Sequence, residues 1–472
     1  MSSGSATQVA LPVGGPVEGP PTRVRASRYN VVVPHGELVT IYNGVSGQVM
    51  TLTAQDWAAT GDFLAGSDSF PDIGLLRDLT LGHMLVSDRT DELELLEQRY
   101  RAGAGDRTTF GLTIVTSLGC NFDCPYCYQV KPRAILDSET EELLLEVLGG
   151  QLPTITEFHV TWFGGEPLLA TDRLFELSEQ FLSRTRAAGV DYSARIVTNG
   201  YLLTPDVARR LAEYGVRSAQ ITLDGPAEVH DRMRPLRNGR GTFDVVLDNV
   251  VACANLLPIQ IRVNLDTSNV ATYQPLLDLL AQRGLGGRVE VQPGQLVAYD
   301  EQIGAPSETY RPQCFTLPEF AQVKRDFLAS ARTLGLASAS LPQPIETPCT
   351  AVRVNELVVG ANGELYKCWD SVGNAAEVVG HLRSWRDPDD RMLKWLHYDP
   401  FADAGCRSCI ALPTCMGGCA HHAFTASSAD AKCSTFRLTT VRQVEEYVAA
   451  AEAIGTGAGL RHALLPIVAV SG

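Results

Sequence analysis

The sequence lacks several features that mark whole classes of protein. No run of about 18 uninterrupted apolar residues occurs, which excludes a membrane-spanning helix. Basic residues number 39 against 54 acidic ones, so the net charge of −15 argues against binding nucleic-acid phosphates or an anionic membrane surface. Residues 1–26 have neither a charged start nor a long apolar run, and we interpret them as a flexible tail, not a signal peptide. We therefore expect a cytoplasmic protein with no nucleic-acid or membrane partner.

Cysteine is absent from residues 1–119 and abundant afterwards. The chain has 12 cysteines, and in a reducing cytosol clustered cysteines are typical of metal ligands or catalysts. Three lie within residues 120–127 and seven within 349–433, while Cys253 and Cys314 stand alone. The two dense groups are therefore candidate metal sites, and Cys253, in a predicted helix, is expected to be a core residue.

The rest of the composition is that of a globular protein, with 45% hydrophobic and 20% charged residues. Strand-like alternation within residues 28–60 and polar, helix-like text to about residue 100 predict a small α+β module, and 101–106 is a predicted linker. After residue 340 the periodicity weakens and cysteines become dense, which predicts a loop-rich region held by metal. The expected parts are a tail at 1–26, the module at 27–103, a barrel at 108–335, a cysteine-rich domain at 340–436 and a C-terminal helix and tail at 437–472.

Between these regions, short apolar runs alternate six times with longer amphipathic segments. Strand followed by helix predicts parallel βαβ units, and so an α/β fold with a partial (β/α)6 barrel. The predicted strands are 110–117, 157–163, 193–198, 217–223, 259–265 and 288–292. The predicted helices are 138–149, 172–187, 205–214, 243–254, 272–283 and 317–334, with a further one at 437–454.

Polar or glycine-rich segments follow four of these strands directly. The first cysteine group follows the first strand, and residues 164–167, 198–200 and 224–226 follow the next three. Because chemistry in such sheets and barrels takes place at the carboxyl ends of the strands, we expect these segments to meet on one face.

The first cysteine group places Cys120, Cys124 and Cys127 on one loop. Three thiolates can hold three irons of a 4Fe–4S cluster and leave the fourth iron open to a small ligand. The alternatives are a zinc knuckle that lacks one ligand, or buried cysteines.

Together these motifs resemble the radical SAM superfamily over roughly residues 108–300. The matching residues are Cys120, Cys124 and Cys127 with Tyr126, then Gly164, Gly165, Glu166 and Pro167, then Thr198 and Asn199, and finally Asp224 and Arg234. The resemblance implies that the open iron binds S-adenosylmethionine (SAM). It further implies that Glu166 holds the amino group of SAM, Tyr126 lies beside the adenine, and Thr198 and Asn199 face the ribose or methionine end. Arg234 is either a partner for a carboxylate of the cofactor or substrate, or an ordinary surface arginine.

The second cysteine group resembles the SPASM domain that follows many radical SAM barrels. The resemblance implies two auxiliary 4Fe–4S clusters, the first held by Cys349, Cys368 and Cys419 and the second by Cys406, Cys409, Cys415 and Cys433. Full sets have an eighth cysteine shortly before the position of Cys349, and this chain has none there. The fourth position of the first cluster is therefore open or non-cysteine, or it is taken by Cys314. Zinc, with His421 and His422 as additional ligands, is the alternative.

Radical SAM enzymes with SPASM domains mostly modify peptides and proteins, so the resemblance implies a peptide maturase that abstracts hydrogen and forms an oxidative crosslink. The alternatives are a sulfatase-type formylglycine maturase and, outside catalysis, an iron–sulfur electron-transfer scaffold, which would not need residues 164–167. Sulfatase maturases have a catalytic Asp directly after the Cys368 position; here Trp369 stands there, and Asp370, one residue later, is a candidate base. Expected partners are a peptide or protein substrate with a leader segment and a flavodoxin- or ferredoxin-type reductant. The 27–103 module loosely resembles leader-recognition elements, and the alternative is a simple cap.

Overall fold

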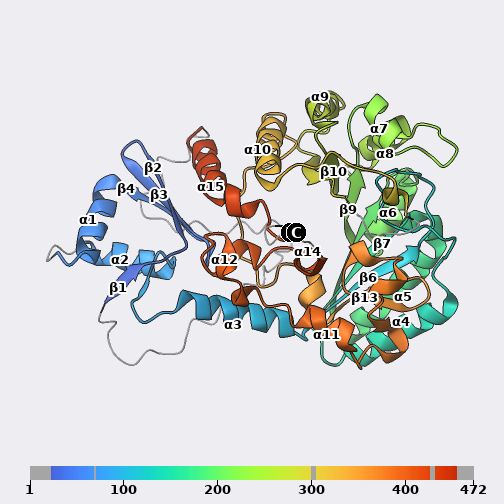
Figure 1. Cartoon of the computed structure of the whole chain (residues 1–472), viewed down its shortest axis with the longest axis horizontal. Coiled ribbons are helices and arrows are strands. Elements are labelled where there is room, and N and C mark those ends of the chain that lie inside the picture. Colours follow the sequence, from blue (N-terminus) through green and yellow to red (C-terminus); the bar gives the residue numbers. More distant parts are fainter. Residues whose placement is uncertain (1–22, 68–70, 299–304, 426–430, 454–472) are drawn as a thin grey trace. The chain divides into compact units, whose positions relative to one another are not determined.

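The computed structural model describes residues 23–67, 71–298, 305–425 and 431–453 (Figure 1). The chain divides into two compact units, one formed by residues 1–92 and 451–472 and the other by residues 93–450. Within the described ranges, no helix combines the length and the apolar character needed to cross a bilayer.

The first unit is a small α+β module, as predicted. Its antiparallel three-stranded sheet has the order β2-β3-β4, and a two-stranded ribbon pairs β1 with β5. The core includes Ile41, Leu52, Leu79 and Met84, and these residues come from the sheet, α2 and the segment before β5. The elements are β1 (Val24–Ala26), β2 (Asn30–His35), β3 (Leu38–Asn43), β4 (Val49–Thr53), α1 (Ala54–Leu64), α2 (Ile73–Leu81) and β5 (Leu85–Ser87).

The second unit is built on a nine-stranded sheet with the order β11-β10-β9-β8-β7-β6-β12-β13-β14. The strands β6 to β11 are parallel and lie next to one another in chain order, which confirms the predicted βαβ units. These strands are β6 (Thr109–Ser117), β7 (Glu157–Gly164), β8 (Asp191–Thr198), β9 (Val216–Thr222), β10 (Ile259–Leu265) and β11 (Val289–Gln295). The helices between and after them are α4 (Ser138–Gln151), α5 (Thr171–Ala188), α6 (Pro205–Glu213), α7 (Ala227–Met233), α8 (Phe243–Cys253), α9 (Tyr273–Gln282) and α10 (Leu317–Thr333).

Local signals explain why these helices begin where they do. The side chains of Asp137 and Thr204 accept backbone N–H groups at the starts of α4 and α6, and Pro205 occupies the first turn of α6. At the start of α10, Thr316 and Glu319 form a reciprocal capping box. The chain leaves α5 through Gly189 at a φ of 70°, a conformation that suits glycine.

Three features differ from the predictions. The strand β12 (Glu356–Val359) from the cysteine-rich region pairs in parallel with β6, so the sheet continues beyond the six predicted strands. The short helix α7 follows the fourth strand and was not predicted. The predicted linker at 101–106 is wrong for residues 101–105, because they form the last turns of α3 (Glu92–Gly105). The glycines there are tolerated because the helix is stabilised by tertiary contacts, one of which joins the Tyr100 hydroxyl to the carbonyl of Tyr398 at 2.5 Å.

The cysteine-rich region is loop-rich, as predicted (orange to red in Figure 1). Its helices are short, apart from the last one, and its strands β13 (Glu364–Tyr366) and β14 (Gly380–His381) extend the sheet beside β12 in antiparallel pairs. Gly363, at a φ of 81°, lies in the turn before β13. The helices are α11 (Asp390–Leu396), α12 (Ala404–Arg407), α13 (Leu412–Cys415), α14 (Ala420–Thr425) and α15 (Phe436–Ala453).

Candidate active site

The first cysteine group lies on the loop that directly follows β6. Cys120 and Cys124 are buried and Cys127 is half-buried. Burial raises the pKa of Cys124 to about 12, with Arg234 opposing this effect, and burial also raises the pKa of Cys120. The thiols influence one another, since Cys127 contributes to raising the pKa of both. Without a bound metal, Cys120 and Cys124 are therefore protonated at neutral pH, and a metal that binds them must displace those protons.

A short extended segment after α7 holds this loop in place. The backbone N–H of Asp123 donates to the carbonyl of Pro235 at 2.8 Å, and that of Arg237 donates to Asn121 at 3.1 Å. The two segments therefore form a small antiparallel bridge. The cysteine loop thus has a defined backbone path although it contains no regular secondary structure.

The two glycines after β7 allow a second loop to pack directly on the first. A Cβ on Gly164 would lie 2.2 Å from the carbonyl oxygen of Ser117, and Gly164 also has a φ of 136°. A Cβ on Gly165 would lie 2.5 Å from the carbonyl oxygens of both Leu118 and Gly119. Real Cβ atoms do not approach a carbonyl so closely, so only glycine fits at either position.

Glu166 is fully buried and its carboxylate is satisfied by the chain itself. One oxygen accepts the N–H of Leu168 at 2.9 Å and the hydroxyl of Thr198 at 2.7 Å, and the other accepts the N–H of Asn199 at 2.7 Å. Burial raises the pKa of Glu166, and these three donors oppose that shift. The carboxylate therefore joins the loop after β7 to the loop after β8. Pro167, next to it, begins a 3-10 turn and is also buried.

Tyr126 and Arg234 belong to a buried polar network. The Tyr126 hydroxyl lies 2.5 Å from an oxygen of Asp224 and accepts a hydrogen bond from Arg234 at 2.6 Å. Asp224 also accepts the N–H of Asn264 at 3.0 Å. The interpretation of Arg234 as a surface arginine is wrong, because its side chain is only 11% exposed and forms a 4.0 Å ion pair with Asp224. It also lies over the ring of Phe122 at 5.6 Å, so it connects the fourth strand to the cysteine loop.

These segments surround one cavity of about 460 Å³ in the second unit. Its wall contains three thiols, the two glycines and several polar groups from the strand ends, which confirms for the first three segments the expectation that the motifs meet on one face. Residues 224–226 lie outside this wall, and Asp224 joins it through the Tyr126 hydroxyl. Of the residues predicted from the sequence, Cys120, Cys124, Cys127, Tyr126, Gly164, Gly165, Thr198, Asn199, Arg234 and Asp370 line the cavity. Glu166 and Pro167 are buried beneath this lining.

The far side of the same cavity comes from the cysteine-rich region. Trp369, Asp370 and His422 line it, and the guanidinium of Arg195 lies over the Trp369 ring at 5.7 Å. Sequence reasoning gave His422 only the role of an alternative zinc ligand and gave Arg195 no role. No motif in the sequence marks either residue, because His422 reaches the cavity, and Arg195 reaches the Trp369 ring, through tertiary packing.

The seven cysteines between 349 and 433 separate into two groups by their electrostatic influence on one another. The thiols of Cys349 and Cys419 both raise the pKa of Cys368, after the larger effect of burial. In the second group, the neighbouring thiols raise the pKa of Cys415, again after burial. The neighbours of Cys415 are Cys406, Cys409 and Cys433.

The lone cysteines lie elsewhere. Cys253 is fully buried in α8 and contacts the carbonyl of Leu203 at 3.4 Å, which confirms it as a core residue. Cys314 is exposed and raises the pKa of Tyr310 as a minor contributor after burial. Within the described ranges, no group of three or more histidine, cysteine, aspartate or glutamate side chains is arranged to hold a single metal ion.

Comparison with known proteins agrees with this geometry. Residues 114–280 match the model of the radical SAM superfamily. The mycofactocin maturase MftC of Mycolicibacterium smegmatis is 26% identical over 327 residues, which cover 65% of this chain and 77% of that protein. A serine-type anaerobic sulfatase-maturating enzyme of Klebsiella aerogenes is 28% identical over 135 residues, or 28% of this chain and 33% of that protein.

Among solved structures, native anSMEcpe with bound AdoMet shares the fold with a TM-score of 0.56 at 17% identity, covering 72% of this chain and 99% of that one. A radical SAM domain implies a 4Fe–4S cluster and SAM. The residues of the cavity fit this pair: three thiols line its wall, the glycine loop packs on the cysteine loop and lines the same wall, and the buried Nε of Arg234 has no hydrogen-bond partner among the described residues. The chain is therefore an enzyme with a radical SAM domain, and its homologues include maturases.

Proposed function

We propose that this enzyme is a radical SAM peptide maturase with a SPASM-type C-terminal domain, and that it installs an oxidative crosslink in a ribosomally synthesised peptide. The observation that supports this most is the composition of the 460 Å³ cavity. One side of it contains the three thiols of the cysteine loop, and the other contains Trp369, Asp370 and His422 beside the second cysteine group. A substrate carbon between the two sides is near both.

On the side of the cavity formed by the cysteine loop, each residue has a proposed role. Cys120, Cys124 and Cys127 would hold a 4Fe–4S cluster that, with bound SAM, supplies the chemistry of hydrogen abstraction. Gly164 and Gly165 allow their loop to pack on the cysteine loop, which shapes the wall beside the three thiols. The Glu166 carboxylate fixes the loop that carries Thr198 and Asn199, so it acts on the site by positioning these residues.

The second cysteine group would hold two auxiliary 4Fe–4S clusters and accept the electron released on crosslinking. Cys349, Cys368 and Cys419 are the ligands of the first, and Cys406, Cys409, Cys415 and Cys433 of the second. Their electrostatic grouping supports this division. Cys419 influences the pKa of both Cys349 and Cys368, whereas Cys314 influences that of Tyr310; we therefore propose a group other than Cys314 for the fourth position of the first cluster.

Asp370 is the proposed general base. It lines the cavity and raises the pKa of Cys368, so its carboxylate lies near both the substrate space and the first auxiliary site. The second candidate function, formylglycine formation, is favoured by the sulfatase-maturating relative. Trp369 at the position of the expected aspartate weighs against it.

The first unit is the proposed leader-binding module. Among its described residues, β2 pairs with β3 alone, which leaves one edge of the sheet available to an added strand. We further propose a cytoplasmic location, where 12 free thiols stay reduced, and a flavodoxin or ferredoxin as the electron donor.

The test uses full-length enzyme reconstituted anaerobically with iron and sulfide. We expect about twelve irons per chain, from three clusters, and formation of 5′-deoxyadenosine with SAM and dithionite. Cys124→Ala should abolish 5′-deoxyadenosine and keep about eight irons, whereas Cys253→Ala, the control, should keep both. Retained SAM cleavage in Cys124→Ala would contradict the proposal, and so would zinc in place of the eight irons assigned to the two auxiliary clusters.

The substrate class is tested with short peptides encoded by neighbouring reading frames. A crosslink removes two hydrogen atoms and joins two residues, so the product resists fragmentation between them. Oxidation of a serine to formylglycine also removes two hydrogen atoms, so a serine peptide whose product loses the same mass but fragments at every bond would instead support formylglycine formation. Conversion of a cysteine also exchanges sulfur for oxygen and would be recognised by its larger loss of mass.

A further inference from the structure

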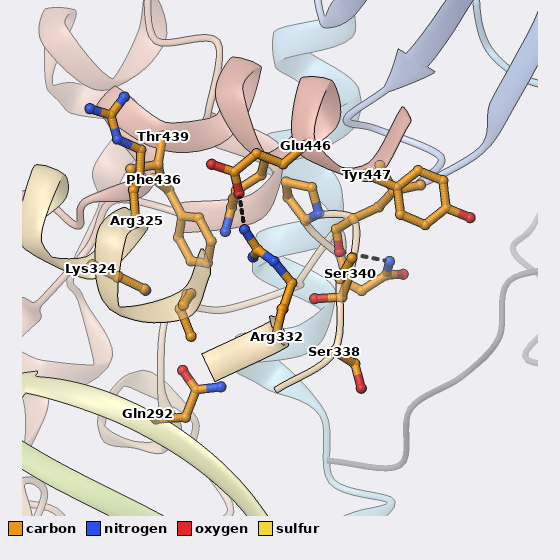
Figure 2. A pocket seen from close by; sticks show the side chains of 16 residues that line it. Gln292, Lys324, Arg325, Arg332, Ser338, Ser340, Phe436, Thr439, Glu446 and Tyr447 are labelled. Atoms are coloured by element: carbon orange, nitrogen blue, oxygen red, sulfur yellow. Dashed lines mark hydrogen bonds and ion pairs between the residues drawn. The ribbon is translucent and has the colours of Figure 1, made fainter. Parts of the chain in front are cut away.

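A second pocket, of about 220 Å³, lies between α10, α15 and the segment 338–343 of the second unit (Figure 2). Its charged lining residues are the three cations Lys324, Arg325 and Arg332 and the single anion Glu446. The chain as a whole has a net charge of −15, so this local excess of positive charge opposes the overall balance.

Two of the three cations, Lys324 and Arg325, have no ion pair among the described residues; Arg325 donates to the side-chain oxygen of Gln322, which leaves Lys324 as the cation without a polar partner there. Its ammonium lies 5.4 Å from the centre of the Phe436 ring, and desolvation alone lowers its pKa. Among the described residues no carboxylate pairs with it, whereas Arg332 has an ion pair of 2.8 Å with Glu446 (Figure 2). A partly buried ammonium without a counter-charge is costly, and an anionic ligand group would offset that cost.

The same pocket also contains an unused acceptor. The side-chain oxygen of Gln443, on α15, is buried and has no hydrogen-bond partner among the described residues. A ligand that matched both groups would bring a negative charge to Lys324 and an N–H donor to Gln443. A carboxylate close to an amide N–H is the chemistry of an acidic residue within a peptide.

The pocket and the active-site cavity are linked by one strand. Gln292 of β11 lines this pocket, and Gln295, three residues further along the same strand, lines the cavity with the cysteine loop. Three strand residues span about 10 Å. Because side chains alternate along a strand, Gln292 and Gln295 lie on opposite faces of β11, which is an edge strand of the described sheet. An extended peptide with its acidic residue at Lys324 reaches the cavity by passing over this edge.

We propose that the pocket between α10 and α15 binds an acidic side chain of the peptide substrate, with Lys324 taking the carboxylate and Gln443 a neighbouring amide N–H. This inference rests on the proposed function, because it takes the substrate to be a peptide. It assigns the substrate a negatively charged anchor a short distance from the reacting residue.

Binding is measured on the reconstituted full-length enzyme by ligand-observed NMR, with N-acetyl-L-glutamate amide as the probe and N-acetyl-L-glutamine amide as its neutral match. We expect the glutamate probe to bind at least tenfold more tightly than the glutamine one. Lys324→Met, which keeps the apolar stem over Phe436, should remove this preference and weaken binding about tenfold or more. Lys394→Met is the matched control, because Lys394 lies over Phe424 at 4.6 Å outside the pocket, and it should leave binding unchanged.

Equal binding of both probes, or unchanged binding in Lys324→Met, would overturn the proposal. Inorganic phosphate with an affinity equal to that of the glutamate probe would show a general anion site and would overturn the peptide assignment. Because none of these measurements requires turnover, they fail or succeed independently of SAM cleavage.

Discussion

Replacing Arg234 by methionine should loosen the cysteine loop more than any other single change in the buried network. The methionine retains much of the apolar volume against Phe122 but removes the one positive charge that, among the described residues, lies within 4.0 Å of Asp224. It also removes the donor to the Tyr126 hydroxyl. Asp224 is fully buried, so its carboxylate would remain in the interior with the Tyr126 hydroxyl and the Asn264 N–H as its hydrogen-bond donors, and with the weaker influence of Arg262.

The expected size of the effect follows from the burial of both partners. Breaking a buried ion pair by removing one side costs about 3–5 kcal/mol, because the remaining charge is uncompensated. Burial already raises the pKa of Asp224, and Arg234 is the largest influence opposing that rise. The opening of the loop should therefore become roughly 100 to 5,000 times more frequent. Adding Asp224→Asn removes the stranded charge, so the double variant should be more protected than Arg234→Met alone.

Hydrogen–deuterium exchange of the peptide covering residues 118–130 measures this opening in the full chain before cluster reconstitution. The control is Arg209→Met, whose exposed ion pair with Asp206 should contribute less than about 1 kcal/mol. Wild-type exchange in Arg234→Met would refute the reasoning. The reasoning would also be refuted if the double variant increased the exchange rate by the product of the two single-variant factors, because the two changes would then act independently.

Two further predictions concern the same site. Gly165→Ala should lower 5′-deoxyadenosine formation at least tenfold, because the new Cβ would lie 2.5 Å from two carbonyl oxygens. Gly149→Ala in α4 is the control and should have no such effect, because no atom lies within 4 Å of its new Cβ. Equal activities of the two variants would contradict the packing argument. Burial holds the pKa of His230 well below its usual range, so the folded chain resists a proton that the unfolded chain takes up below about pH 6.5. The free energy of unfolding should thus decrease as the pH falls below 6.5, by up to about 1.4 kcal/mol per pH unit. Denaturant titrations at several pH values should show a smaller decrease for His230→Asn. An unchanged dependence on pH would exclude this histidine as the cause.

Much of the barrel could be predicted because its signals are local. Apolar runs of strand length and capping residues such as Thr204 and Thr316 are visible in the chain, and the predicted bounds of most strands and helices differ from the structure by one or two residues. The cysteine loop and the glycine pair were also predictable, because their spacing is itself the chemical signal. Helix α3 shows the limit of this approach: Gly103 and Gly105 indicate a linker, but tertiary contacts hold them in a helix.

The arrangement of the site's far side could not be predicted, because it depends on contacts between distant segments. Four residues of β12 carry too weak a pattern to show that they join the barrel sheet. Arg234 looks like one arginine among several in a charged loop, and only its packing against Tyr126 and Asp224 makes it part of the buried network. The three internal donors of Glu166, through which its carboxylate supports the loop after β8, were equally invisible in the sequence, and its contact with the amino group of SAM stays a prediction.

The pairing of β6 with β12 has a consequence for how the protein is made. Strand β6 is almost entirely buried, yet β12, which pairs with one of its two edges, is synthesised much later. For example, the Asn355 side chain donates to the carbonyl of Thr109 and lies 246 residues further along the chain. At about 5–20 residues per second the ribosome needs roughly 12 to 50 s for that distance. During this time the nascent barrel has an unprotected strand edge next to the cysteine loop, which is both an aggregation hazard and an open route to the thiols. Translation therefore gives the cell an interval in which iron and sulfide can reach the loop before the C-terminal segment closes the sheet beside it.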